Sequence, residues 1–279
     1  MGHLATKFSR RSSVFSSNSP LSIQQMREVA PSVFAEEKHP SRSARYTYIP
    51  TVEILKELAK EGFNPFMVAQ SKSRLGMHSH TKHMVRLRHD GVTSTYGDAA
   101  TETNEIILVN SHNGGSSYQM LAGVFRFVCC NGLINGDISN DIRVPHKGDI
   151  MGDVIKGAYQ VLQGFSKMDE AIDRMKRTLI TMDQEVQFAE DALAVRFGRA
   201  LWYKPHPVTP TQALFARRQE DQEPTLWNVF QRLQENLMTG MPPDPGRTRA
   251  TRAVRSIDGS LHMNRMLWTL AELRSGRGF

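Results

Sequence analysis

The chain has 279 residues, of which 39% are hydrophobic and 23% are charged. This is the composition of an ordinary soluble protein, so we expect a substantial core in one large domain or two small ones. The only two cysteines are adjacent, which excludes a secreted disulfide scaffold, and no apolar run approaches the about 20 residues that cross a bilayer. We therefore predict a cytoplasmic protein without a membrane partner. The net charge of +7 favours an anionic partner.

Residues 1–45 are predicted to form a flexible basic tail, because serines are frequent in them and only residues 23–34 have a helical pattern. Firmer structure is predicted from Thr51, which suits the N-cap of a helix of about ten residues with apolar side chains at helical spacing. Gly62 follows the last apolar position and is expected to end this helix. A short strand is predicted next, over residues 67–70.

Residues 80–89 have the alternating pattern of a half-buried strand. Val85 and Leu87 are expected to face the core, whereas Arg86 and Arg88 are expected to face outward.

The centre of the chain is predicted to be a buried hairpin within residues 104–136. Its first strand contains the apolar run 106–109, in which β-branched residues dominate, as in strands that are covered on both faces. Asn113-Gly114-Gly115 supplies the turn. A returning strand follows, and we predict a short helix over residues 124–130.

Residues 153–197 carry an a/d heptad pattern over about six heptads, which predicts one long helix or a helical pair. The repeated apolar positions are Val154, Ala158, Val161, Phe165, Met168, Ile172, Met175, Leu179, Met182, Val186, Ala189 and Leu193. The flanking positions include apolar residues, so we expect this helix to pack on the chain's own sheet, the alternative being a neighbouring subunit.

Prolines after residue 204 are expected to separate a smaller helical region, residues 205–279, from an α+β core domain, residues 46–200. In the C-terminal region, one helix begins after Pro224 and another covers residues 261–273. The predicted fold class is therefore α+β, with a mostly antiparallel sheet beside the long helix 153–197 and a small, arginine-rich, helical C-terminal region.

Basic residues gather near the N-terminus, in residues 72–89 and after Pro245, as in a nucleic-acid-binding surface. Planar guanidinium groups suit phosphates, and an arginine inside an apolar segment, such as Arg126, needs an ion pair or a ligand. The predicted nucleic-acid-binding residues are Arg86, Arg88, Arg126, Arg217, Arg218, Arg247, Arg249, Arg252 and Arg255. Trp227, Phe230 and Trp268 offer stacking faces, although aromatic residues at helical spacing favour a packing role.

Three other groups could carry chemistry. His78, His80 and His83 form H-x-H-x-x-H, but on a strand the third histidine falls on the opposite face, so a surface role is preferred to metal binding. The adjacent Cys129 and Cys130 are expected to be buried, inert thiols. The polar loop 111–117 fits a hairpin turn or an anion-binding loop equally well. We predict no catalytic residue, metal or cofactor.

The segment SHNGGSSYQML…GVFRFVCCNGLI resembles the signature of a phage- and plasmid-borne family, domain of unknown function 932. The similarity extends to further motifs downstream. These are Ala216-Arg217-Arg218 with Asp221, Leu226-Trp227-Asn228 with Gln231, Gln234-Glu235-Asn236, Arg252, Asn264 and Leu267-Trp268. The resemblance implies a mobile-element protein acting around DNA, with a remote fold relation to single-strand annealing recombinases.

Together, charge placement and this resemblance predict a non-enzymatic, homo-oligomeric protein of a phage or plasmid. It would bind single-stranded DNA in annealing, recombination or plasmid establishment. One alternative is a nucleic-acid-modifying or metal-dependent enzyme centred on His78, His80 and His83. Another is a virion or assembly component that oligomerises through the heptad helix.

Overall fold

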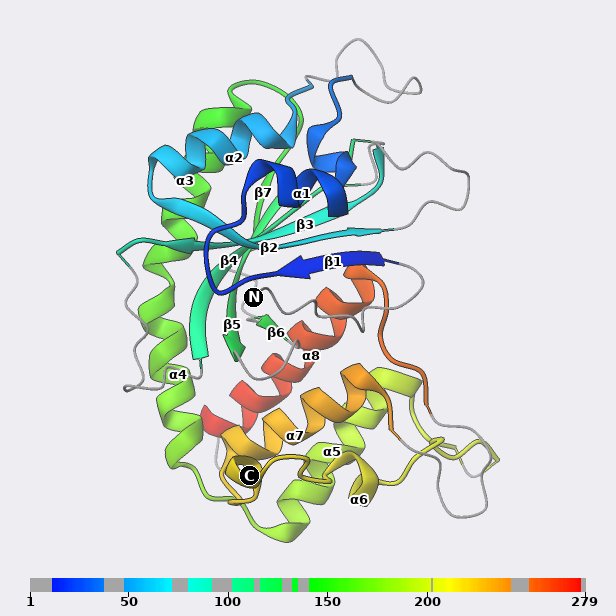
Figure 1. Cartoon of the computed structure of the whole chain (residues 1–279). Coiled ribbons are helices and arrows are strands. Elements are labelled where there is room, and N and C mark those ends of the chain that lie inside the picture. The colour runs from blue at the N-terminus through cyan, green and yellow to red at the C-terminus, as the bar shows by residue number, and fades with distance from the viewer. Residues whose placement is uncertain are drawn as a thin grey trace. The chain divides into compact units, whose positions relative to one another are not determined.

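The computed structural model describes residues 12–37, 48–71, 80–91, 102–112, 116–126, 132–134, 141–201, 203–241 and 251–276. The chain forms two compact units (Figure 1). Unit 1 contains Met1–Gly132, Ile138–Phe165 and Arg255–Ile257, and unit 2 contains Leu133–Asp137, Ser166–Val254 and Asp258–Phe279. No helix among the described residues is long and apolar enough to cross a membrane.

Unit 1 is built on an antiparallel sheet in which each strand lies beside the next one along the chain. The strands are β1 (Ser12–Ser16), β2 (Phe63–Ser71), β3 (His83–His89), β4 (Glu102–Asn110) and β5 (Tyr118–Arg126), with β7 (Ile142–Val144) also paired to β5. The division of the chain into units falls within a three-residue strand, β6 (Gly132–Ile134), after Gly132. The predicted strands at 67–70 and 80–89 and the central hairpin are confirmed, and the fold class is α+β.

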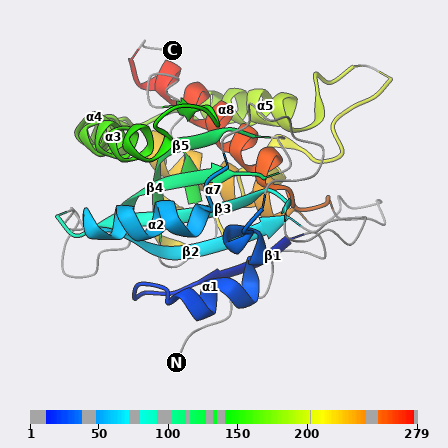
Figure 2. The same ribbon diagram turned by 90° about the horizontal axis from the view of Figure 1, so that it is seen from above.

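Two helices cover the same face of this sheet. In the register, Val85 lies opposite Leu108, and Leu108 lies opposite Met120, so these side chains share one face. The helix α3 (Ile150–Gln163) approaches this face so closely that a Cβ atom on Gly157 would lie 2.3 Å from the terminal methyl carbon of Met120. The helix α2 (Thr51–Lys60) packs on β2 (Figure 2). The result is a two-layer unit.

The N-terminal segment differs from the predicted tail. β1 pairs with β2, and the short helices α1 (Ile23–Val29) and η1 (Pro31–Phe34) follow it. Met26, Val33 and Phe34 are buried. The reason is long-range pairing, because β2 supplies backbone partners that serine-rich composition does not reveal. Residues 1–11 and 38–47 lie outside the described residues.

The predicted helix over residues 124–130 is a second difference. Val124 and Arg126 belong to β5, opposite Asn104 and Glu102 of β4. A full-length partner strand satisfies the backbone groups there, which outweighs the local helical pattern. Residues 127–130 of the predicted helix, including Cys129 and Cys130, lie outside the described part of the chain.

The heptad segment folds as three helices instead of the predicted single long helix or helical pair. They are α3, α4 (Phe165–Arg177) and α5 (Met182–Phe197). Gly164 is the C-cap of α3, and Thr181 begins α5 with a capping box. The heptad pattern therefore does not predict burial around the junction of α4 and α5. Ile172 is fully buried, whereas Leu179 and Met182 are 67% and 81% exposed.

Unit 2 is helical. Besides α4 and α5 it contains α6 (Pro210–Ala213), η4 (Gln219–Asp221), α7 (Leu226–Thr239) and most of α8 (Ile257–Gly276). The central element is α7, which contacts α5, α6 and η4. Its apolar face is buried as predicted, and the rings of Trp227 and Trp268 lie 5.7 Å and 6.3 Å from the ring of Phe230. Trp227 and Trp268 are core residues and offer no face to a base.

Candidate functional site

Arg86 and Arg88, two of the predicted nucleic-acid-binding residues, both bind Glu105. The Glu105 carboxylate is fully buried, and the Arg86 and Arg88 side chains are 11% and 18% exposed. Arg88 Nε lies 2.7 Å from Glu105 Oε1, and its guanidinium carbon lies 4.1 Å from the Phe66 ring centroid. The two cations therefore compensate a buried charge, which leaves little of either guanidinium for a phosphate.

Arg217 and Arg218 fasten the loop after α6 to α7. Arg217 Nε donates to Asn236 Oδ1 over 2.6 Å, and Arg218 makes two bonds of 3.0 and 3.1 Å to Glu235. Of the other predicted arginines, Arg252 and Arg255 are exposed, and the side chain of Arg126 lies outside the description. Arg247 and Arg249 lie in the segment 242–250, which the structure does not describe.

An exposed basic and aromatic surface lies at the C-terminal end of α5. Leu201 and Lys204 exchange two backbone hydrogen bonds of 3.2 and 3.0 Å, which closes a two-residue hairpin. Tyr203 at its tip is 67% exposed. Arg196, in the last turn of α5, donates to the backbone oxygen of Arg252 over 2.8 Å. The arginine segment that includes Arg252 is thereby anchored to the helix end from which the hairpin leaves.

We name this region the arginine–hairpin surface and define it by Arg199, Tyr203, Lys204 and Arg252. Its three cationic side chains are exposed, and no ion pair of theirs is found within the described part of the chain. The sequence contains a signal that the charge analysis missed. From residue 192 to residue 218 there is no Asp or Glu, whereas five residues are Arg or Lys.

A second group of polar side chains is buried in unit 1, and Thr51 is at its centre. Thr51 is the first residue of α2, and Pro50 occupies the N-cap position without a side-chain cap, so the predicted capping role of Thr51 is wrong. Its Oγ1 lies 2.9 Å from His83 Nε2, 3.2 Å from His112 Nε2 and 3.0 Å from Asn110 Nδ2. β3, β4 and the loop after β4 supply these three partners.

The hydrogen-bonding pattern assigns the protons of this cluster. His83 Nδ1 lies 3.0 Å from Ser32 Oγ and 3.4 Å from the backbone oxygen of Thr81. We assign the proton to Nδ1, because the carbonyl oxygen can only accept, and Nε2 then accepts from Thr51. Asn110 Nδ2 and the Nε2–H of His112 donate to the same hydroxyl oxygen. Thr51 then uses one donor and two acceptor sites. Among the described residues, His112 Nδ1 and the hydroxyl of Ser111 are buried atoms for which no hydrogen bond is found, although the backbone of Ser32 also acts on the His112 imidazole.

The imidazoles of this cluster are neutral. Burial lowers the pKa of His83 from 6.5 to about 4. Burial, and then the charge of His83, lowers the pKa of His112 to about 2. Burial also lowers the pKa of His146, whose Nε2 lies 3.1 Å from Asn110 Oδ1. Neutral, weakly basic imidazoles hold hydrogen bonds here and offer no positive charge to an anion at neutral pH.

The histidine motif does not converge on a metal site. His83 points into the buried cluster, His80 Nε2 lies 3.0 Å from the backbone oxygen of Glu37, and His78 lies outside the described residues. Within the described ranges no group of three metal-ligating side chains occurs. Of the predicted loop 111–117, Ser111 and His112 are buried, and residues 113–115 are not described.

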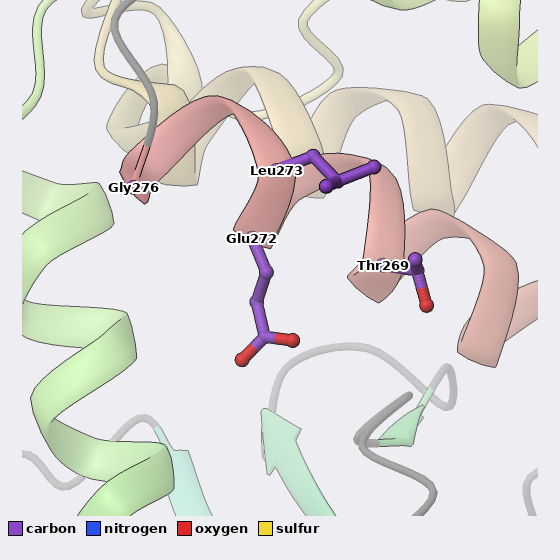
Figure 3. A pocket seen from close by; sticks show the side chains of 4 residues that line it. All are labelled: Thr269, Glu272, Leu273 and Gly276. Carbon is purple, nitrogen blue, oxygen red and sulfur yellow. The ribbon is translucent and has the colours of Figure 1, made fainter.

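A small depression lies on α8 in unit 2 (Figure 3). It is lined by Thr269, Glu272, Leu273 and Gly276, all from this one helix. Its only charged lining residue is acidic, so it is not suited to an anionic ligand.

Comparison with known proteins gives the family of the chain. Residues 38–268 match the model of the family described as "Domain of unknown function (DUF932)". The chain belongs to this family. Two relatives in Escherichia coli strain K12, the UPF0380 proteins YafZ and YfjQ, are each 45% identical over 277 residues, which cover 98% of this chain and 97% of each relative. No solved structure matches the chain significantly. The DUF932 resemblance seen in the sequence is confirmed.

Proposed function

We propose that this DUF932 protein binds single-stranded DNA through the arginine–hairpin surface of unit 2. The observation that carries the proposal is the presence of three exposed cations, Arg199, Lys204 and Arg252, around the end of α5. The first two lie in residues 192–218, which contain no Asp or Glu. Exposed cations without an ion pair among the described residues can neutralise phosphates and release condensed counterions, which is the main source of affinity for a nucleic-acid backbone.

The proposed surface is narrower than the set of arginines predicted from the sequence. Arg86 and Arg88 compensate Glu105, and Arg217 and Arg218 bind α7. Releasing any of them to a phosphate would break an existing interaction. Arg252 needs no such release, and Arg247 and Arg249 precede it in the same arginine-rich segment.

We propose that the protein belongs to a phage or plasmid and acts in annealing, recombination or plasmid establishment. It would do so in the cytoplasm, as a homo-oligomer. This role is supported by the basic surface and by the DUF932 resemblance, which implies a mobile-element protein. The alternative of an enzyme centred on the histidine motif is not supported by its described residues. His83 is buried in a neutral cluster, and His80 is bound to a backbone oxygen.

The test is binding of a fluorescent oligothymidylate, followed by anisotropy at several salt concentrations. Replacing Arg249 and Arg252 together by Ala should weaken binding and make the log–log salt slope shallower by about 1.4, because each single-strand phosphate contact contributes about 0.7. Sequence preference should stay unchanged, since phosphate contacts carry no base information. Arg177→Ala is the matched control, because Arg177 is 80% exposed in the same unit but pairs with Asp173.

Two outcomes would overturn the proposal. One is a parent protein that does not bind the oligonucleotide at low salt. The other is a double variant that binds like the parent and like Arg177→Ala at every salt concentration. Size-exclusion chromatography with and without the oligonucleotide tests the proposed oligomer in the same samples.

A further inference from the structure

We infer that the hairpin closed by Leu201 and Lys204 is a stacking platform that makes the arginine–hairpin surface select unpaired nucleotides. This inference rests on the proposed function, because it names the residue that would make the surface prefer unpaired nucleotides to a duplex. The observation behind it is the placement of Tyr203 at the tip of a hydrogen-bonded two-residue turn.

The exposure of Tyr203 differs from that of the tyrosines in the core. Tyr118 is fully buried, and its hydroxyl donates to the backbone oxygen of Ile49 over 2.9 Å. Tyr203 is 67% exposed, and the neighbouring Leu201 is 42% exposed. A large aromatic ring contributes binding free energy when its apolar surface is removed from water. Because 67% of Tyr203 is exposed, a base stacked on its ring would remove further apolar area from water.

The turn holds this ring in a defined place. The backbone nitrogen of each of Leu201 and Lys204 donates to the oxygen of the other, and Pro205 and Pro207 restrict the chain immediately afterwards. The two residues that flank the tip are therefore held to each other by their backbones. Less conformational entropy is lost when such a group binds than when a flexible tail binds.

The chemistry around the ring identifies the ligand class. Arg199 and Lys204 flank the tip in the sequence, and both are exposed. Cations that follow a phosphate backbone, combined with an aromatic face for a base, are the features of single-strand recognition. In a duplex the faces of the bases are already stacked on one another, so the ring of Tyr203 has no base to contact. The expected ligand is thus an unpaired nucleotide stretch.

The experiment compares a single-stranded oligothymidylate with a duplex of equal length, using the full chain and the variants Tyr203→Ala, Tyr203→Phe and Arg252→Ala. Tyr203→Ala should lower the affinity for the single strand by about tenfold or more, with an unchanged salt slope because no charge is removed. Tyr203→Phe should restore binding, since stacking needs the ring and not the hydroxyl. Duplex affinity should be the same for the parent and Tyr203→Ala.

A second readout follows stacking directly. A single strand containing 2-aminopurine should lose fluorescence on binding to the parent and to Tyr203→Phe, but not on binding to Tyr203→Ala at saturating protein. If Tyr203→Ala binds and quenches like the parent while Arg252→Ala is weakened, the stacking inference is wrong and the proposed function stands. Equal losses on single strand and duplex, or a change of oligomeric state in Tyr203→Ala without DNA, would also overturn it. If the parent protein binds neither the single strand nor the duplex, both the stacking inference and the proposed function are wrong.

Discussion

Replacing Thr51 by Val tests whether the hydroxyl of this residue organises the buried cluster of unit 1. Valine has nearly the size of threonine, so the substitution leaves no cavity. Three buried groups lose a partner, namely His83 Nε2, His112 Nε2 and Asn110 Nδ2. Each buried group without a hydrogen bond costs about 1–3 kcal/mol. We therefore expect the free energy of unfolding to fall by about 3 kcal/mol or more.

If Thr51 only stabilised the start of the helix, the loss in free energy of unfolding would be smaller, because loss of an N-cap costs about 1 kcal/mol. Urea unfolding at neutral pH, followed by far-ultraviolet circular dichroism, measures the difference. Thr51→Ser is the matched control, since it keeps the hydroxyl and removes one methyl group, worth about 1 kcal/mol. The reasoning fails if Thr51→Val loses no more than about 1 kcal/mol, or if Thr51→Ser is as unstable as Thr51→Val.

Three further predictions concern stability. Because the folded-state pKa values of His83 and His112 lie below 6.5, at about 4 and about 2, the unfolded chain binds protons first as the pH falls. The free energy of unfolding should be highest above about pH 6.5 and should fall by about 1.4 kcal/mol per pH unit for each histidine below that pH. Urea midpoints from about pH 8 to about pH 4.5 measure this, and a flat profile contradicts it. Glu105→Gln should lower the free energy of unfolding by about 3–5 kcal/mol, because two poorly exposed guanidinium groups lose their carboxylate; a loss below about 1 kcal/mol in urea unfolding refutes the buried ion pair. Ile172→Ala should cost about 2–5 kcal/mol in the same assay, whereas Leu179→Ala, at an exposed site, should change stability by less than about 0.5 kcal/mol; equal losses would mean that both are packed.

Several elements were predictable because their signals are local. The helix that begins near Thr51 is bounded by Pro50 and Gly62, and the central hairpin has an apolar run followed by a glycine turn. The buried face of α7 repeats at helical spacing within fourteen residues. In each case a few neighbouring side chains contain the whole pattern. Family membership was also visible in short motifs, because these are contiguous in the chain.

The remaining features depend on partners that are distant in the sequence. Thr51 and His112 are 61 residues apart, and Arg217 and Asn236 are 19 residues apart. A threonine that suits an N-cap locally is instead the centre of a hydrogen-bond cluster, because β3 and β4 bring histidine and asparagine to it. Arginines with the spacing of an outward face are held by a carboxylate from the neighbouring strand. Composition and periodicity describe what a residue tends to do with its neighbours, whereas pairing of distant segments decides which polar groups are satisfied and which remain for a ligand.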